Sequence, residues 1–151
     1  MSLDIKVIKN NDANIVSSLV AIERSAFGPN GLSEWEIVPF IRHGLVIALM
    51  LDGKVIGGAQ FLRDWNNPDK AYLFGIAVDS VYRGKGFGTR FLSDCCQRIK
   101  QEGFKSVELT VDANNHPAVK VYKEKLGFIT METRIAEYGE GEDRLVMAKT
   151  L

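Results

Sequence analysis

The sequence contains few cysteines, no long apolar run and no excess of charge of either sign. Its two cysteines, Cys95 and Cys96, are adjacent, so they cannot be spaced ligands of a metal ion. This arrangement indicates a packed or half-exposed pair of thiols in a reducing compartment. No run of ~18 apolar residues is present, and residues 1–10 lack the long apolar core of a secretory signal. We therefore expect a soluble, cytoplasmic protein with no membrane partner.

The charge balance excludes further classes of protein. Lysine and arginine together number 19, as do aspartate and glutamate, so the formal net charge at pH 7 is zero. Without a net positive field a general nucleic-acid binder is disfavoured, although a local basic patch stays open. His43 and His116 have no ligand spacing, so no metal site is expected. With 151 residues, 46% of them hydrophobic, the chain fits a single globular domain over residues 1–151.

Turn and capping signals divide the chain into short helices and strands, with no repeat or linker between them. Strands are expected at 5–8, 45–51, 55–62, 72–78, 106–111, 128–136 and 144–149. Helices are expected at 12–27, 33–42, 86–102 and 117–125. Because a helix separates strands 72–78 and 106–111, we expect these two to be parallel in an otherwise antiparallel, mixed sheet.

Single residues mark several of these boundaries. Asn11 or Asp12 is the expected N-cap of the first helix, and Ser33 that of the second. Asp52-Gly53 between two apolar runs is a strong signal for a two-residue hairpin. Gly127 is expected to end the last helix.

The stretch YRGKGFGTRF, residues 82–91, raises the question of function. It places glycines at 84, 86 and 88, beside Arg83 and Lys85, where an apolar strand ends and an amphipathic helix begins. Ordering glycines costs more backbone entropy than ordering other residues, and helix N-termini hold anions through free N–H groups. The pattern therefore favours an anion site, with a plain strand-to-helix turn as the alternative. It matches neither the P-loop spacing nor the complete dinucleotide fingerprint.

Two blocks of this sequence resemble the GNAT superfamily of acyl-CoA N-acyltransferases. Arg83, Gly86 and Gly88 match its Gln/Arg-x-x-Gly-x-Gly/Ala loop, and NHPAVKVYKEKLGF, residues 115–128, is similar to its Asn-x-x-Ala-x-x-x-Tyr-x-x-x-Gly-Phe pattern. The stretch YLFGIAV before the loop resembles the family's acetyl-CoA strand. The resemblance implies the GNAT fold: an α/β protein whose mixed, mostly antiparallel twisted sheet is flanked by helices and contains a splayed parallel strand pair.

The resemblance also implies acetyl-CoA as cosubstrate. Main-chain groups of Ile76 and Val78 are expected to pair with the pantetheine amides, and Asn115 to bind pantetheine as well. Main-chain amides of the loop, with the Thr89 hydroxyl, are expected to hold the pyrophosphate of coenzyme A. The loop residues concerned are Arg83, Gly84, Lys85, Gly86, Phe87, Gly88 and Thr89.

Tyr122 and Glu108 are the expected catalytic residues. By resemblance Tyr122 lies near the acetyl-CoA sulfur, where a phenol can protonate the leaving thiolate, although a purely packing role stays open. Some family members have a glutamate base at the position of Thr110, and threonine cannot take that part. Glu108, on the same strand face, is the nearest replacement, and Asp112 is another. Either carboxylate could instead be a solvated strand residue.

The expected reaction is transfer of acetyl to a primary amine by direct attack, without a covalent enzyme intermediate. The acceptor is a small molecule or a peptide N-terminus, between which the sequence does not choose. The loop EYGEGEDRLVMAK, residues 137–149, carries acidic residues that either attract a cationic amine or form an ordinary polar hairpin. The alternative function is a non-catalytic acyl-CoA-binding or regulatory module. Homodimerisation through the terminal strands is common in the family, so the resemblance also suggests a homodimer.

Overall fold

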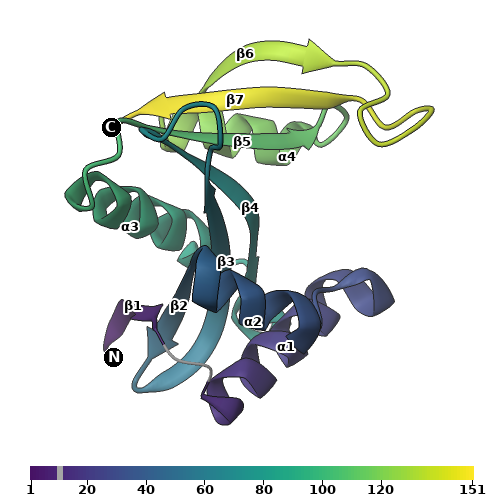
Figure 1. Cartoon of the computed structure of the whole chain (residues 1–151). Helices are drawn as coiled ribbons and strands as arrows, with labels where there is room; N and C mark the ends of the chain where they lie inside the picture. The colour runs from purple at the N-terminus through teal and green to yellow at the C-terminus, as the bar shows by residue number, and fades with distance from the viewer. Residues whose placement is uncertain (10–11) are drawn as a thin grey trace. The chain divides into compact units, whose positions relative to one another are not determined.

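The order of elements in the computed structural model is the predicted one: strand, two helices, three strands, helix, strand, helix and two strands (Figure 1). The structure describes residues 1–9 and 12–151. They form two compact units, Met1–Leu62 with Phe74–Cys95, and Arg63–Leu73 with Cys96–Leu151. Strand β4 (Lys70–Val78) and helix α3 (Phe87–Gln101) each continue from one unit into the other.

The first unit contains the N-terminal elements. These are β1 (Leu3–Ile8), α1 (Ala13–Phe27), the 3₁₀ turn η1 (Gly28–Asn30), α2 (Glu34–His43), β2 (Leu45–Leu51), β3 (Lys54–Arg63) and the 3₁₀ turn η2 (Ser80–Tyr82). Asp12 caps α1 by accepting the N–H of Asn14 at 2.8 Å. Asn11, the other predicted cap, lies outside the described residues. Ser33 caps α2 as predicted, in a reciprocal capping box with Glu36.

Strands β1, β2 and β3 form an antiparallel meander in this unit. The predicted hairpin is confirmed: Asp52 and Gly53 have φ values of 49° and 81°, as a two-residue turn of the primed type requires. Apolar side chains of α1 and α2 pack against β1 and β2. The buried residues of this core are Ile8, Val16, Leu19, Ile37, Ile41, Val46 and Ala48.

The second unit contains β5 (Ser106–Asp112), α4 (His116–Lys120), η3 (Val121–Lys125), β6 (Ile129–Arg134) and β7 (Arg144–Thr150). Lys70 to Tyr72 of β4 pair in parallel with Ser106 to Glu108, which confirms the predicted parallel pair. Strand β7, yellow in Figure 1, runs antiparallel to both β5 and β6. The strand order is β1-β2-β3-β4-β5-β7-β6 in a mixed, mostly antiparallel sheet.

The helix expected at 117–125 differs from its prediction. Only His116–Lys120 is α-helical, and Val121–Lys125 is a π-helix. The wider turn ends where the Phe128 N–H donates to the Tyr122 carbonyl at 2.9 Å, with Gly127 at φ 77°. Apolar spacing does not distinguish this widening from an α-helix, although π-turns are frequent at functional sites. Among residues 1–9 and 12–151, no helix is both long enough and apolar enough to cross a membrane.

Candidate functional site

The glycine loop lies in the first unit, between the end of β4 and helix α3. Gly84 and Gly86 have φ values of 75° and 80°, a conformation that other residues adopt only with strain. Apart from the chain neighbours, a Cβ atom added at either position would meet no heavy atom of the described residues within 4 Å. Glycine is therefore required by the backbone conformation, and the space beside the loop is open.

A cavity of about 280 Å³ lies at this loop. It is lined by Val78, Tyr82, Arg83, Gly84, Gly86, Phe87, Gly88 and Thr89. The N–H of Arg90 donates to the Gly86 carbonyl at 3.2 Å, so the preceding N–H groups come before the hydrogen-bond ladder of α3. Such groups carry partial positive charge and are suited to an anion of phosphate size.

The two cations of the loop have defined positions. Arg83 Nε donates to the Val78 carbonyl at 3.1 Å, which ties the loop to the last residue of β4. Lys85 Nζ lies 5.9 Å from the centroid of the Tyr82 ring, and Lys54 Nζ lies 6.0 Å from it. The predicted cations thus lie at the loop, adding positive charge to that of the helix N-terminus.

The end of β4 is held in place on its other side by β3. The Asp79 N–H donates to the Ile56 carbonyl at 2.8 Å, and Asp79 itself caps the turn η2. Ile76 and Val78 are half-buried and Ala77 is buried. Packing of these side chains does not prevent their main-chain groups from binding a ligand. The expected pairing of Ile76 and Val78 with pantetheine stays a prediction.

Asn115 and Tyr122 lie in the second unit. Asn115 caps α4 by accepting the Ala118 N–H at 3.3 Å. The sequence analysis predicted only a cofactor-binding role for this residue and missed the cap. The Tyr122 ring packs 6.0 Å from the Phe128 ring, centroid to centroid. Burial raises the pKa of the Tyr122 phenol above its ordinary value, so the hydroxyl keeps its proton throughout the neutral range.

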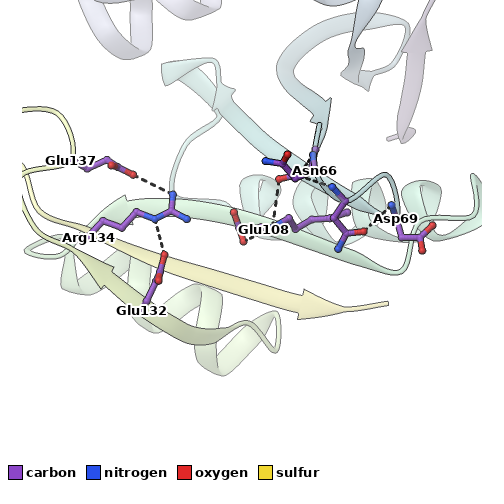
Figure 2. A network of polar contacts seen from close by, with 9 residues as sticks. Asn66, Asp69, Glu108, Glu132, Arg134 and Glu137 are labelled. Carbon is purple, nitrogen blue, oxygen red and sulfur yellow. Dashed lines mark hydrogen bonds and ion pairs between the residues drawn. The ribbon is translucent and has the colours of Figure 1, made fainter.

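Glu108 lies in an ion pair within the same unit (Figure 2). Its Oε1 is 3.1 Å from Lys70 Nζ, which also lies 3.5 Å from Asp64 Oδ2. The hydrogen bond to Glu108 raises the pKa of Lys70, so the ammonium stays charged. Glu108 is therefore a paired strand carboxylate, and its role as a base stays a prediction.

Sequence reasoning missed a hydrogen bond between neighbouring strands. Tyr72 and Thr110 lie 3.2 Å apart through their hydroxyl oxygens, on the face of the sheet that also carries Glu108. Burial is the main cause that raises the pKa of the Tyr72 phenol, and the Tyr138 hydroxyl interacts with it. Tyr72, Glu108 and Thr110 come together because the parallel register places Tyr72 opposite Glu108. No local sequence pattern specifies the register between two strands so distant in the chain.

A second cavity, of about 330 Å³, adjoins the Lys70–Glu108 pair. Ile129 and Met131 of β6 line it and are exposed, so it combines an apolar wall with an ion pair. The remaining lining residues are Ser106, Glu132, Val146, Ala148, Lys149 and Thr150.

The acidic residues near the last hairpin are mostly engaged with other groups. Figure 2 shows Arg134 between two carboxylates, 2.7 Å from Glu132 and 3.1 Å from Glu137. Asp143 accepts the Ala136 N–H at 2.8 Å, and Glu142 lies 3.8 Å from Arg144. These contacts favour the structural alternative for this loop.

Comparison with known proteins defines the family. The acetyltransferase (GNAT) family matches residues 17–128, and the chain belongs to this family. The mycothiol acetyltransferase of Corynebacterium glutamicum is 30% identical over 89 residues, which are 59% of this chain and 30% of that protein. The chain thus matches less than a third of the length of that relative.

A ribosomal protein bS18-alanine N-acetyltransferase from Escherichia coli is similar over more of its length. It is 36% identical over 83 residues, 53% of this chain and 55% of that protein. The crystal structure of the ribosomal-protein-S18-alanine N-acetyltransferase from Escherichia coli has a TM-score of 0.81 and 25% identity, covering 99% of this chain and 94% of that one.

An aminoglycoside 6'-N-acetyltransferase solved with coenzyme A has a TM-score of 0.79. The match covers 97% of this chain and 96% of that chain, at 18% identity. At this identity the similarity shows the fold alone, and it agrees with the predicted GNAT architecture.

Proposed function

We propose that the protein is an acetyl-CoA-dependent N-acetyltransferase acting on a primary amine of a small molecule or a peptide. The observation that carries the proposal is the open cavity at the main-chain N–H groups before α3, in a chain of the GNAT family. A structural neighbour solved with coenzyme A supports the cosubstrate. The Escherichia coli relatives, named for an alanine of a ribosomal protein, support a peptide acceptor.

The residues of the first unit fit the cosubstrate by their chemistry. The N–H of Arg83 donates to the Ser80 carbonyl at 3.3 Å, so main-chain amides of Gly84 to Gly88, with the Thr89 hydroxyl, would hold its diphosphate. Ile76 and Val78 would pair with the pantetheine amides through their backbone. Asn115 is a further residue proposed to bind pantetheine. Acetyl-CoA supplies an acetyl group activated as a thioester.

Tyr122 is the proposed general acid. In the reaction a C–N bond forms between amine and acetyl carbon, the C–S bond breaks, and the proton lost by nitrogen ends on sulfur. Tyr122 supplies the proton that the leaving thiolate needs, and proton return from the amine through base and solvent restores the phenol. Its raised pKa keeps the phenol protonated and ready to donate at neutral pH.

Glu108 is the proposed general base, because the attacking amine must be neutral and free amines are largely protonated at pH 7. Lys70 contacts Oε1 of Glu108, and a carboxylate has a second oxygen with lone pairs of its own. Glu108 would therefore accept the proton on Oε2, directly or through water, while the ion pair fixes the orientation of the carboxylate.

The second candidate is a non-catalytic acyl-CoA-binding or regulatory module. The Lys70–Glu108 ion pair favours it, because this contact explains Glu108 without catalysis, and Thr110 stands where some relatives have a glutamate. Thiol release from acetyl-CoA, measured with a panel of amines and of peptides with free N-termini, separates the two. The enzyme releases coenzyme A with at least one acceptor, whereas a module binds coenzyme A and releases none.

The proposal also covers the cellular location, the number of domains and the oligomeric state of the protein. Cys95 and Cys96 are both buried and neither is in a disulfide, which supports the predicted cytoplasmic location. A single N-acetyltransferase domain over residues 1–151 and a homodimer through the terminal strands complete the proposal. Analytical ultracentrifugation of the full chain tests the dimer, and a single cooperative unfolding transition tests the single domain.

A further inference from the structure

Two polar side chains are almost completely buried in the first unit. Glu23, near the C-terminal end of α1, is 4% exposed, and Gln60, in the middle of β3, is 1% exposed. The neighbours of Gln60 in β3 are buried as well, so its amide lies in an apolar environment. Polar groups at such positions require hydrogen-bond partners, because burial removes their contacts with water.

Glu23 forms a hydrogen bond with one end of the Gln60 side-chain amide. Its carboxylate accepts the Leu32 N–H at 3.2 Å and forms a side-chain hydrogen bond with Gln60. An ionised carboxylate only accepts hydrogen bonds, so Gln60 must direct its NH₂ group toward Glu23. The carbonyl oxygen, Oε1, then faces the other way.

Within the described residues, Gln60 Oε1 is a buried atom without a hydrogen-bond partner. The two ends of the amide face different glycines: Nε2 is 3.8 Å from a Cβ added at Gly58, and Oε1 is 2.9 Å from a Cβ added at Gly75. The unpartnered oxygen is thus directed at β4, the strand on which the cosubstrate is proposed to bind.

Gly75 is the residue of β4 that faces the unpartnered oxygen. In the described part of the chain, Gln60 Oε1 is the one heavy atom beyond the adjoining residues that a Cβ at Gly75 would meet within 4 Å. The φ of Gly75 is outside the left-handed region, so its backbone conformation does not require glycine. A Cβ at this position would come too close to Oε1, so the Gln60 side chain would have to shift.

We propose that Gln60 Oε1 accepts a hydrogen bond from the amino group of the acyl acceptor, and that Glu23 is the positioning residue that orients the Gln60 amide. This inference rests on the proposed function and adds a specificity-determining contact to it. The site favours a hydrogen-bond donor, which an amine has and the anionic diphosphate lacks. A neutral primary amine has two N–H groups, so one can bind Oε1 while the nitrogen lone pair remains free to attack.

Steady-state kinetics test this contact with three variants. Gln60→Met removes the oxygen at similar volume, and Gly75→Ala places a methyl group 2.9 Å from Oε1, so the Gln60 amide must shift out of its position. Gln97→Met, at an exposed position of α3, is the matched control. We expect both site variants to raise the KM of the best amine of the panel by about tenfold, the effect of losing a neutral hydrogen bond. The KM of acetyl-CoA stays within about twofold.

A spectroscopic measurement reports on the contact without turnover. The side-chain amide signals of Gln60 in a ¹H–¹⁵N spectrum are assigned by their loss in Gln60→Met, and the wild-type protein is titrated with coenzyme A and then with ethylammonium chloride. We expect the signals to shift with the amine and to stay in place with coenzyme A. If Gln60→Met does not fold, the same titration of Gly75→Ala, in which the shift is abolished, tests the inference.

The outcomes separate this inference from the proposed function. Turnover with unchanged acceptor KM in both site variants, or Gln60 signals that move with coenzyme A instead of the amine, overturns the Gln60 contact while leaving the acetyltransferase intact. If the Gln60 signals shift with ethylammonium but the protein releases no thiol, the amine site is supported and the proposed acetyltransferase activity is contradicted.

Discussion

The ammonium of Lys70 lies 3.1 Å from Oε1 of Glu108, joining the first residue of β4 to the middle of β5 (Figure 2). This ion pair connects two strands that are parallel neighbours, and both side chains are less than a quarter exposed. It gives Glu108 a structural role that can be measured separately from catalysis.

Glu108→Gln should affect stability and turnover differently. The hydrogen bond to Glu108 raises the pKa of Lys70, so the pair stabilises the fold wherever Lys70 is protonated, below its ordinary pKa of 10.5, and is lost as pH rises through the raised value. We expect the variant to lower the free energy of unfolding, measured in urea at pH 7, by about 1 kcal/mol. This difference should disappear at high pH. If Glu108 is also the base, kcat falls about 100-fold or more. Lost stability with unchanged kcat would leave the carboxylate a structural role only.

Tyr122→Phe should lower turnover without weakening coenzyme A binding. Removing the hydroxyl deletes the proposed proton donor while keeping the ring that packs against Phe128, so we expect kcat to fall about 100-fold or more. The Kd of coenzyme A, measured by calorimetry, should stay within about twofold. Equal losses in kcat and affinity would remove the acid role.

The same residue predicts a pH dependence. Burial raises the pKa of the Tyr122 phenol from 10.0, and the acid works only while protonated. Any decline of kcat due to Tyr122 should therefore have its midpoint above pH 10, and Tyr122→Phe should abolish it. A wild-type decline near pH 8 that vanishes in the variant contradicts this assignment.

Gly86→Ala and Gly103→Ala separate backbone strain from cosubstrate binding. Both glycines have positive φ, 80° and 96°, and a Cβ at either position meets nothing within 4 Å. Each substitution should therefore cost about 1–2 kcal/mol of stability. Only Gly86→Ala, in the loop before α3, should weaken coenzyme A binding, by tenfold or more in Kd. Similar affinities in the two variants would mean that the loop merely turns the chain.

Glu23→Gln should change the pH dependence of stability. Burial is the largest influence on Glu23 and raises its pKa from 4.5, so the folded protein holds this proton to a higher pH than the unfolded chain does. Stability from this effect is present below pH 4.5 and lost as pH rises through the raised pKa. The unfolding free energy of wild type should therefore fall relative to the variant from pH 4.5 upward. Glu140→Gln, at an exposed site, is the control, and profiles that remain parallel contradict the prediction.

The sequence predicts features that depend on neighbouring residues. Asp12 and Ser33 at helix starts, the Asp52-Gly53 turn and the glycines before α3 satisfy local backbone requirements, and these elements formed as expected. The acyltransferase resemblance rested on such local motifs, and the family match confirms it.

Features that depend on distant residues could not be predicted in this way. Tyr72 meets Thr110 because of a strand register, and Gln60 meets Glu23 because α1 covers β3, neither of which leaves a local pattern. The π-helix around Tyr122 is likewise invisible to helical periodicity, because a segment of five residues is too short to show a change of period.

The central claim is that main-chain N–H groups between Arg83 and Thr89 hold the diphosphate of coenzyme A. A crystal structure of the protein with coenzyme A tests it most directly. We predict diphosphate oxygens within hydrogen-bond distance of these groups, in the cavity beside Gly84 and Gly86. Coenzyme A bound elsewhere, with side chains of the loop filling that cavity, would contradict the account.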